Sequence, residues 1–165
     1  MAPAFLVVLL AAGTLLSSTE AQEAYDNLPE TFKKGVDLAV QHVNSHANIQ
    51  QLFLFFKSLQ KSSIDSGFNV NVIYHHFYLK ATKCSKATEN PDTKKCPFRN
   101  DRPLIDCALC YKAFSGKIEE NPVPYVNCVH KPVLTEEMKA TRVERCNAMG
   151  YSIGAATLLA STGTD

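Results

Sequence analysis

The pattern of hydrophobic and polar positions predicts one helix near the N-terminal end of the chain. Between residues 28 and 43, apolar residues recur at spacings of three and four and form a single stripe: Leu28, Phe32, Val36, Ala39, Val40 and Val43. Asn27 and Glu30 can form a capping box, and Pro29 suits an early helical position. We therefore expect an amphipathic helix that starts near Asn27 and ends near Ser45.

The chain that follows this helix has the pattern of β-strands. Residues 52–59 are rich in phenylalanine and predict a central strand, and residues 68–79 alternate as a second strand would. The polar run 62–67 predicts the turn between them. The remaining predicted segments are strands at 106–114 and 125–130, an uncertain stretch at 135–140 that could be a short helix, and an extended piece at 141–146.

This order of elements predicts an α+β fold, in which one N-terminal helix packs on a four- to five-stranded antiparallel sheet. Successive residues of a strand face opposite sides of its sheet. His75 and His76 therefore cannot bind one metal ion together, and we expect no metal site there. Cys107 and Cys110, three positions apart, should likewise form disulfides with different partners.

The first 21 residues have the features of a secretory signal peptide. Residues 4–12 form an apolar core, and Thr19 and Ala21 place small residues where signal peptidase cleaves. Cleavage after Ala21 also removes Glu20, which changes the net charge from +1 for the whole chain to +2 for the mature chain. The alternative is a buried N-terminal helix. We expect a secreted protein.

Composition excludes several classes of protein. The chain has 165 residues, of which 45% are hydrophobic and 20% charged, so it is neither a disordered polar chain nor a collagen. No apolar run approaches the roughly 20 residues of a membrane-spanning helix. The near-neutral net charge argues against nucleic acid as a partner.

Six cysteines lie in the second half of the chain: Cys84, Cys96, Cys107, Cys110, Cys128 and Cys146. In an oxidising compartment they predict three disulfides, for which fifteen pairings are possible. The Cys107–Cys110 step resembles a redox pair or half of a zinc site, but the other cysteines are isolated. We expect structural disulfides instead.

A cationic segment surrounds the first two cysteines. The segment contains seven cationic residues and three acidic ones, Glu89, Asp92 and Asp101, so its net charge is +4. We call it the basic loop: Lys80, Lys83, Lys86, Lys94, Lys95, Arg99 and Arg102. It could attract heparin-like polysaccharides or bacterial membranes by nonspecific electrostatics. The alternative is a solvated loop whose charges only aid solubility.

The tail after the last cysteine, residues 147–165, contains three glycines and no lysine or arginine, and we expect it to be mobile. Its apolar part, residues 151–160, could bind a receptor groove once the polar end is removed. The candidate receptor-contacting residues are Tyr151, Ile153, Leu158, Leu159 and Ala160. The alternatives are a frayed terminus or a last edge strand on the sheet.

No cluster of residues predicts catalysis. Cysteines committed to disulfides supply no thiol nucleophile, and no pair of side chains suggests an acid and a base. We expect no enzyme activity, no cofactor and no metal.

The order of elements and the cysteine spacing together resemble the cystatin–cathelicidin superfamily. Within it, the six-cysteine pattern is similar to that of the chemerin family: Cys84, a basic loop to Cys96, ten residues to Cys107, the Cys-x-x-Cys step, then Cys128 and seventeen residues to Cys146. The resemblance covers residues 28–146.

The resemblance implies the pairs Cys84–Cys96, Cys107–Cys128 and Cys110–Cys146. It implies a signal peptide (1–21), a cystatin-like domain (22–146) and a processed C-terminal tail (147–165). Chemerins are adipokines whose tail is trimmed by extracellular proteases, and the new C-terminus activates a G-protein-coupled receptor in chemotaxis, inflammation and adipocyte differentiation. We expect this chain to be a monomer. The tail here lacks their aromatic-rich, Pro-Gly-containing ending.

The same superfamily suggests two other functions. Cystatin inhibitors of cysteine proteases insert an apolar first hairpin loop, whereas the predicted turn around residues 60–67 is polar and contains Lys61 and Asp65, whose burial would oppose insertion. The chain also lacks the tryptophan of their second loop. A cathelicidin-like host-defence protein usually has a strongly cationic tail, which this chain lacks.

Overall fold

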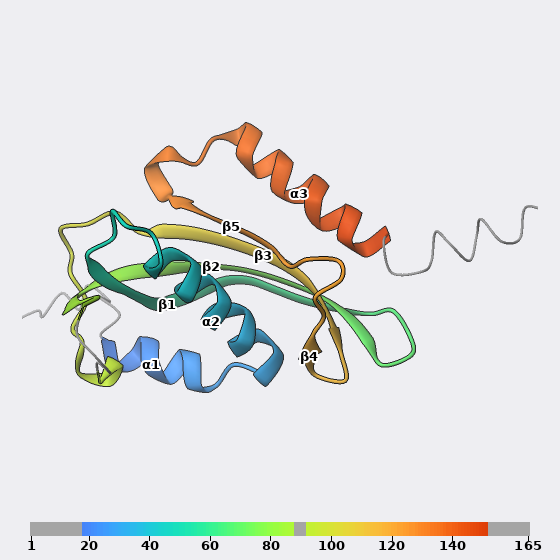
Figure 1. Ribbon diagram of the computed structural model, residues 1–165, viewed down its shortest axis with the longest axis horizontal. Coiled ribbons are helices and arrows are strands. Elements are labelled where there is room, and N and C mark those ends of the chain that lie inside the picture. Colours follow the sequence, from blue (N-terminus) through green and yellow to red (C-terminus); the bar gives the residue numbers. More distant parts are fainter. Residues whose placement is uncertain (1–17, 88–91, 152–165) are drawn as a thin grey trace, which may run out of the picture.

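The computed structural model describes residues 18–87 and 92–151 (Figure 1). The predicted N-terminal helix is α2 (Glu30–Asn44), which begins after Pro29 and buries the predicted stripe. It lies across one face of an antiparallel sheet, which we call the inner face. Phe32, Val36 and Ala39 of α2 are buried against this face.

The sheet contains five strands among the described residues: β1 (Gln51–Asp65), β2 (Val70–Ser85), β3 (Ile105–Phe114), β4 (Lys117–Ile118) and β5 (Tyr125–His130). β1 pairs with β2 and β2 with β3, while β4 and β5 both pair with the other edge of β3. All pairs are antiparallel. The predicted fold class, a helix on a four- to five-stranded antiparallel sheet with three disulfides, is confirmed.

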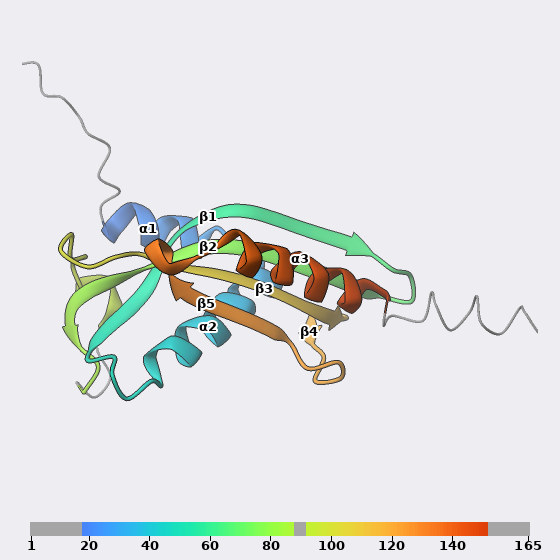
Figure 2. The ribbon, with the colours of Figure 1, turned by 90° about the horizontal axis from the view of Figure 1, so that it is seen from above.

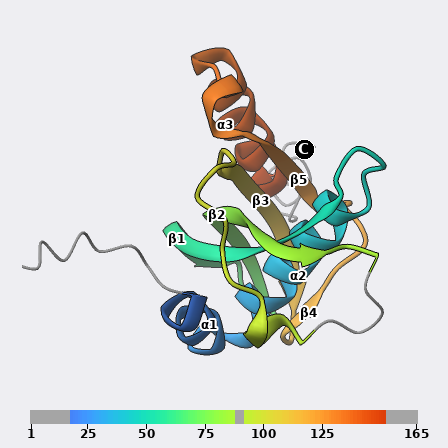
Figure 3. The ribbon, with the colours of Figure 1, turned by 90° about the vertical axis from the view of Figure 1, so that its left-hand side faces the viewer.

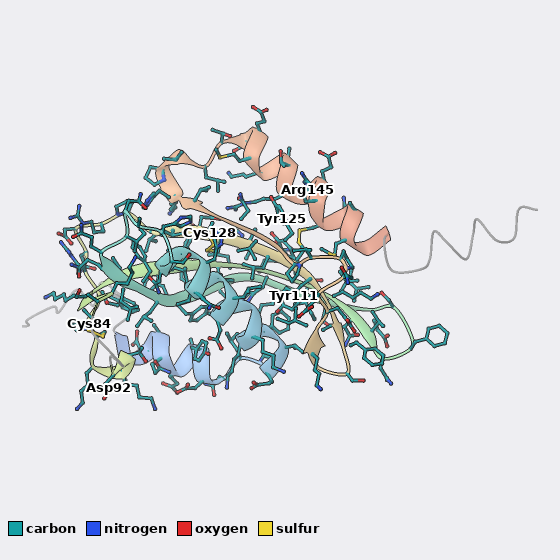
Figure 4. All side chains as sticks on the ribbon, in the orientation of Figure 1. Cys84, Asp92, Tyr111, Tyr125, Cys128 and Arg145 are labelled. Atoms are coloured by element: carbon teal, nitrogen blue, oxygen red, sulfur yellow. A yellow bond between two sulfur atoms is a disulfide. The ribbon has the colours of Figure 1, made fainter. Side chains whose placement is uncertain are left out.

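A second helix, α3 (Glu136–Tyr151), covers the opposite, outer face of the sheet (Figure 2). As a result β3 is buried on both faces, and residues 105–111 are all buried. Leu109 and Tyr111 point to the inner face, whereas Cys110 points to the outer face. The side chain of Tyr111 lies between the sheet and α2, where its hydroxyl donates to the carbonyl of Thr31 at 2.6 Å (Figure 4).

α3 corrects the prediction of an extended segment at residues 141–146. The helix also absorbs the uncertain stretch 135–140, since it begins at Glu136. Arg142, Cys146 and Met149 follow one another at helical spacing and all face the sheet. The segment is largely polar, and its apolar residues do not repeat with a helical period, so the helix could not be recognised from the sequence.

The first hairpin also differs from the prediction. Residues 62–65, three of which are polar, belong to β1, because Asp65 still pairs with Asn71 of β2. The turn is residues 66–69, where Gly67, Phe68 and Asn69 all have positive φ. Three such residues in a row reverse the chain without a longer loop.

An additional helix, α1 (Ser18–Asp26), precedes α2 and packs beside β1 (Figure 3). Ala21, after which we predicted cleavage of the signal peptide, is 1% exposed within α1. Residues 1–17 of the predicted signal peptide lie outside the described part of the chain.

Two short 3-10 helices complete the described elements: η1 (Thr93–Lys95) and η2 (Lys131–Val133). Within residues 18–87 and 92–151, no helix is long and apolar enough to cross a membrane. The same residues contain no group of three or more histidine, cysteine or acidic side chains arranged to hold a metal ion.

Candidate functional site

The six cysteines form the pairs Cys84–Cys96, Cys107–Cys128 and Cys110–Cys146, which are those implied by the resemblance. Cys107 and Cys128 face each other directly in the register of β3 and β5. Cys110 lies on the outer face and bonds to α3. The two cysteines of the Cys-x-x-Cys step thus have different partners, as their opposite orientations on a strand require.

A buried ion pair is the second anchor of α3. Arg142 of α3 and Asp106 of β3 are each only 4% exposed, and their side chains are in direct contact. The guanidinium of Arg142 also donates to the backbone carbonyl of Asp106 at 3.0 Å and to Oδ1 of Asn127 at 2.7 Å. His76 of β2 approaches the same Asp106 carboxylate with Nε2 at 2.8 Å. One helix is therefore tied to three strands through a single carboxylate and its neighbours.

The environment of Asp106 keeps it ionised. Burial by itself raises the pKa of this carboxyl, but the hydrogen bonds from His76 and Arg142 outweigh burial, so the pKa of Asp106 lies below its ordinary value. Because the guanidinium of Arg142 and the carboxylate of Asp106 are buried together, each charge has a partner of opposite sign. The arrangement holds α3 in place and gives it one orientation on the sheet.

An apolar contact completes the anchor toward the C-terminal end of α3. Met149 is 6% exposed and packs with Val72 and Cys110. Tyr125 of β5 lies between the sheet and α3 and borders the same cluster (Figure 4). The covalent, ionic and apolar contacts together fix the helix from Arg142 to Met149.

The predicted tail begins inside this helix. Its proposed start at residue 147 is in the last part of α3, and Tyr151, a candidate receptor contact, is the last residue of that helix. The other candidates, Ile153, Leu158, Leu159 and Ala160, lie outside the described residues. The helix thus continues five residues past Cys146, to Tyr151.

The basic loop is less cationic on its surface than its sequence predicts. Lys80 is 9% exposed, because its ammonium group lies over the rings of Phe56 and Phe98, 4.8 and 5.7 Å from their centroids, and donates to Asn100. Burial lowers the pKa of Lys80. This lysine is part of the fold and not a surface contact for a polyanion.

Three other cations of the basic loop have partners within the protein. Lys86 donates to the carbonyl of His46 at 2.8 Å, Lys95 lies 3.7 Å from the Asp92 carboxylate, and Arg99 forms an ion pair with Asp101. Lys83, Lys94 and Arg102 have exposed side chains. The loop therefore presents scattered charges, several of them already neutralised.

His75 and His76 point to opposite faces of β2, as predicted. His75 is fully buried on the inner face, where it contacts the rings of Phe32 and Phe77, and its Nε2 lies 2.8 Å from Oγ of Ser58. Burial lowers the pKa of His75 to about 3, with a further contribution from the charge of Lys61. His75 thus belongs to the inner core, whereas His76 belongs to the polar network around Asp106.

Two loops at the other end of the sheet expose large apolar side chains. Phe68, at the tip of the β1–β2 hairpin, is 90% exposed, and Val123, between β4 and β5, is 74% exposed. The backbone N–H of Ser115 donates to the carbonyl of Asn69 at 3.0 Å, which brings the hairpin next to the turn between β3 and β4. The sequence assigned the hairpin tip to polar residues and so missed Phe68.

The comparisons with known proteins give a distant relationship. No family model matches the chain. A protein of Clarias batrachus described as a cystatin-like protein is 28% identical over 170 residues, which cover 98% of this chain and 91% of that protein. This similarity supports a cystatin-like relationship, in agreement with the helix-on-sheet fold, and does not single out a narrower group. The three disulfides are typical of extracellular proteins.

Proposed function

We propose that this chain is a secreted precursor of the chemerin type, whose C-terminal segment becomes an activating ligand after proteolysis. The partners in this proposal are an extracellular protease that shortens the tail and a chemerin-type G-protein-coupled receptor that reads the new C-terminus. The proposed outcomes are chemotaxis, inflammation and adipocyte differentiation. The protein would act by binding, without catalysis or a cofactor.

The observation that carries this proposal is the anchoring of α3. The Cys110–Cys146 disulfide and the Arg142–Asp106 ion pair hold the last described helix on the outer face of the sheet up to its end at Tyr151. An anchored helix reduces the conformational entropy that a terminal peptide attached to it loses on binding. The cysteine spacing that resembles the chemerin family supports the same function.

The test is a series of C-terminal truncations of the mature protein, from Asp165 back to Tyr151. Each protein is added to cells that carry the chemerin receptor, and calcium flux is measured, with receptor-free cells as the control. At least one truncation should be active at a lower concentration than the full-length chain. If every truncation is as inactive as the full-length chain, the precursor mechanism is wrong.

The role of the anchor can be tested in the same assay. The most active truncation is compared with a version that also carries Cys110→Ser and Cys146→Ser, and with a version that carries Cys84→Ser and Cys96→Ser. Loss of potency in the first and not in the second would tie activity to the position of α3. Equal potency of the truncated protein and its two cysteine variants would mean that the terminal peptide acts without the anchoring of α3.

Inhibition of cysteine proteases is the second candidate, and the exposure of Phe68 favours it. Lys61 and Asp65, which oppose burial in a protease cleft, belong to β1, whereas the tip carries an apolar ring. The purified mature protein should be assayed against papain, together with Phe68→Ser. Inhibition that the substitution abolishes would support this function, and complete inactivity of the wild-type protein would remove it.

A further inference from the structure

Two lysines from distant parts of the chain meet beside the ring of Tyr78 in β2. Lys57 of β1 places its ammonium nitrogen 5.8 Å from the centroid of this ring, and Lys131 of η2 places its own at 5.0 Å. Tyr78 is half-buried and Lys131 is exposed. We call this group the lysine–tyrosine cluster. It shares no residue with the basic loop, and no pattern in the sequence predicted it.

A bulge in β1 puts Lys57 into the cluster. Phe55 pairs with Leu79, but Lys57 pairs with Tyr78, so one extra residue, Phe56, is inserted between them. Strict alternation would turn Lys57 to the inner face with Phe55. The bulge turns it to the outer face beside Tyr78, while Phe56 is buried in an edge-to-face contact with Phe98.

The opposite side of the cluster is set by η2. The backbone N–H of Lys131 donates to the carbonyl of Leu104 at 2.8 Å, and its carbonyl accepts from Leu134 at 3.3 Å. These bonds hold the start of η2 against the end of the sheet. The ammonium group of Lys131 is thereby directed over Tyr78 from a fixed backbone.

The chemistry of the cluster suits an anion attached to a ring. Two like charges at one aromatic ring repel each other, and bound anionic groups relieve that repulsion. Each ammonium group keeps donors that the ring does not use. The half-exposed face of Tyr78 can stack against an apolar ring plane, and the imidazole of His76 lies next to it, with centroids 6.4 Å apart.

We propose that the lysine–tyrosine cluster binds a linear sulfated polysaccharide, with a sugar ring against Tyr78 and sulfate groups at Lys57 and Lys131. The cluster lies on the outer face of the sheet, the face on which α3 contacts β3 and β5. A linear polymer of sulfated sugars can use both the ring of Tyr78 and the two ammonium groups beside it. The three disulfides place the protein where such polysaccharides occur. This inference does not depend on the proposed precursor function.

The test is retention of the mature protein on immobilised heparin, measured as the salt concentration at elution. The double variant Lys57→Gln/Lys131→Gln is compared with Lys94→Gln/Lys95→Gln, which removes the same charge from exposed positions of the basic loop. We expect the first to elute at clearly lower salt, with an affinity for a heparin oligosaccharide about tenfold weaker, because two ionic contacts are lost. The second should elute close to the wild-type protein.

Two further variants distinguish binding at a specific site from attraction by net charge alone. Tyr78→Leu leaves both charges in place and should also weaken binding, whereas Lys57→Arg/Lys131→Arg should retain it. Circular dichroism melts of each variant show whether the fold is intact. The Arg double variant also tests the proposal if the Gln variant misfolds, because loss of retention in a folded, fully charged protein would contradict it.

Several results would overturn the proposal. One is a wild-type protein that heparin does not retain at physiological ionic strength. Another is an equal shift of the two Gln double variants, which would mean that only net charge matters. A third is binding to phosphatidylserine–phosphatidylcholine vesicles, but not to heparin, that requires Lys57 and Lys131.

Discussion

Arg142 and Asp106 form a buried ion pair between α3 and the middle of the sheet, with each side chain 4% exposed. The pair joins α3, which the periodicity of the sequence did not predict, to β3, in which eight of the ten residues are buried. It also connects with Asn127 and His76, so that residues from β2, β3, β5 and α3 share one polar network. This network is one of the contacts that hold α3 on the sheet.

Removal of Arg142 should destabilise the protein strongly. Arg142→Ala leaves the Asp106 carboxylate buried without its guanidinium partner, and the free energy of unfolding should fall by about 3–5 kcal/mol. The measurement is guanidinium chloride denaturation with the disulfides intact. The matched control is Arg145→Ala on the exposed side of the same helix, which should change stability by less than about 0.5 kcal/mol. Equal losses in both variants would contradict the role of the pair.

The disulfide of α3 should contribute more stability than the disulfide of the basic loop. Cys110 and Cys146 are 36 positions apart, whereas Cys84 and Cys96 are 12 apart. Loop-closure entropy then predicts that Cys110→Ser/Cys146→Ser costs about 1 kcal/mol more than Cys84→Ser/Cys96→Ser. Urea denaturation of the two variants gives the difference, and hydrogen exchange of α3 should accelerate only in the first. A larger loss in the second variant would be inconsistent with this reasoning.

Gly35 of α2 should not tolerate a methyl group. An added Cβ would lie 2.7 Å from a ring carbon of Tyr111, whose side chain is fully buried and hydrogen-bonded to Thr31. Although alanine favours a helix by about 1 kcal/mol, overpacking costs about 1–3 kcal/mol, so Gly35→Ala should be destabilising on balance. Thermal denaturation checks the sign. Gln41→Ala, at an exposed position of α2, should be nearly neutral, and a stabilising Gly35→Ala would refute the predicted clash.

His75 should make the protein less stable as the pH falls. Its pKa is about 3 in the folded protein and about 6.5 in the unfolded chain, so between these values the unfolded chain binds the additional proton. Stability from this group is complete above about pH 6.5 and is lost as the pH falls toward 3, with a slope of up to about 1.4 kcal/mol per unit.

The variant Ser58→Ala/His75→Phe tests this dependence. It keeps the aromatic contacts and removes both partners of the polar pair, so its stability should vary less with pH than that of the wild-type protein. Titration of the carboxylates, including Asp106, is common to both proteins. Nuclear magnetic resonance should show an His75 ring that remains neutral down to about pH 4. A ring that titrates near 6.5 would contradict its burial.

Local patterns predicted α2 and the strands because their apolar residues repeat at a period that one buried face requires. α1 was missed because its first residues were assigned to the signal peptide and the rest form a short polar segment. The strand β1 was cut short because residues 62–65 are mostly polar, although pairing with β2 continues through them. These differences arise where contacts with a distant strand outweigh local preference.

The site residues show the same division. The cysteine spacing indicated the disulfides, whereas the pairing itself came from a resemblance. Lys80 was counted with the basic loop, but the rings of Phe56 and Phe98 cover it. The lysine–tyrosine cluster depends on a one-residue bulge, which alternation along a single strand does not reveal.

The sequence by itself determined the period of α2 and of the main strands, the fold class and the number of cysteines, because these depend on neighbouring residues and on composition. Only the tertiary structure decided that a polar C-terminal segment is a helix on the outer face of the sheet and which lysines are buried or brought together. The physical reason is that the Arg142–Asp106 ion pair and the Cys110–Cys146 disulfide each stabilise that helix across 36 positions of the chain, through contacts that exist only after the strands are aligned.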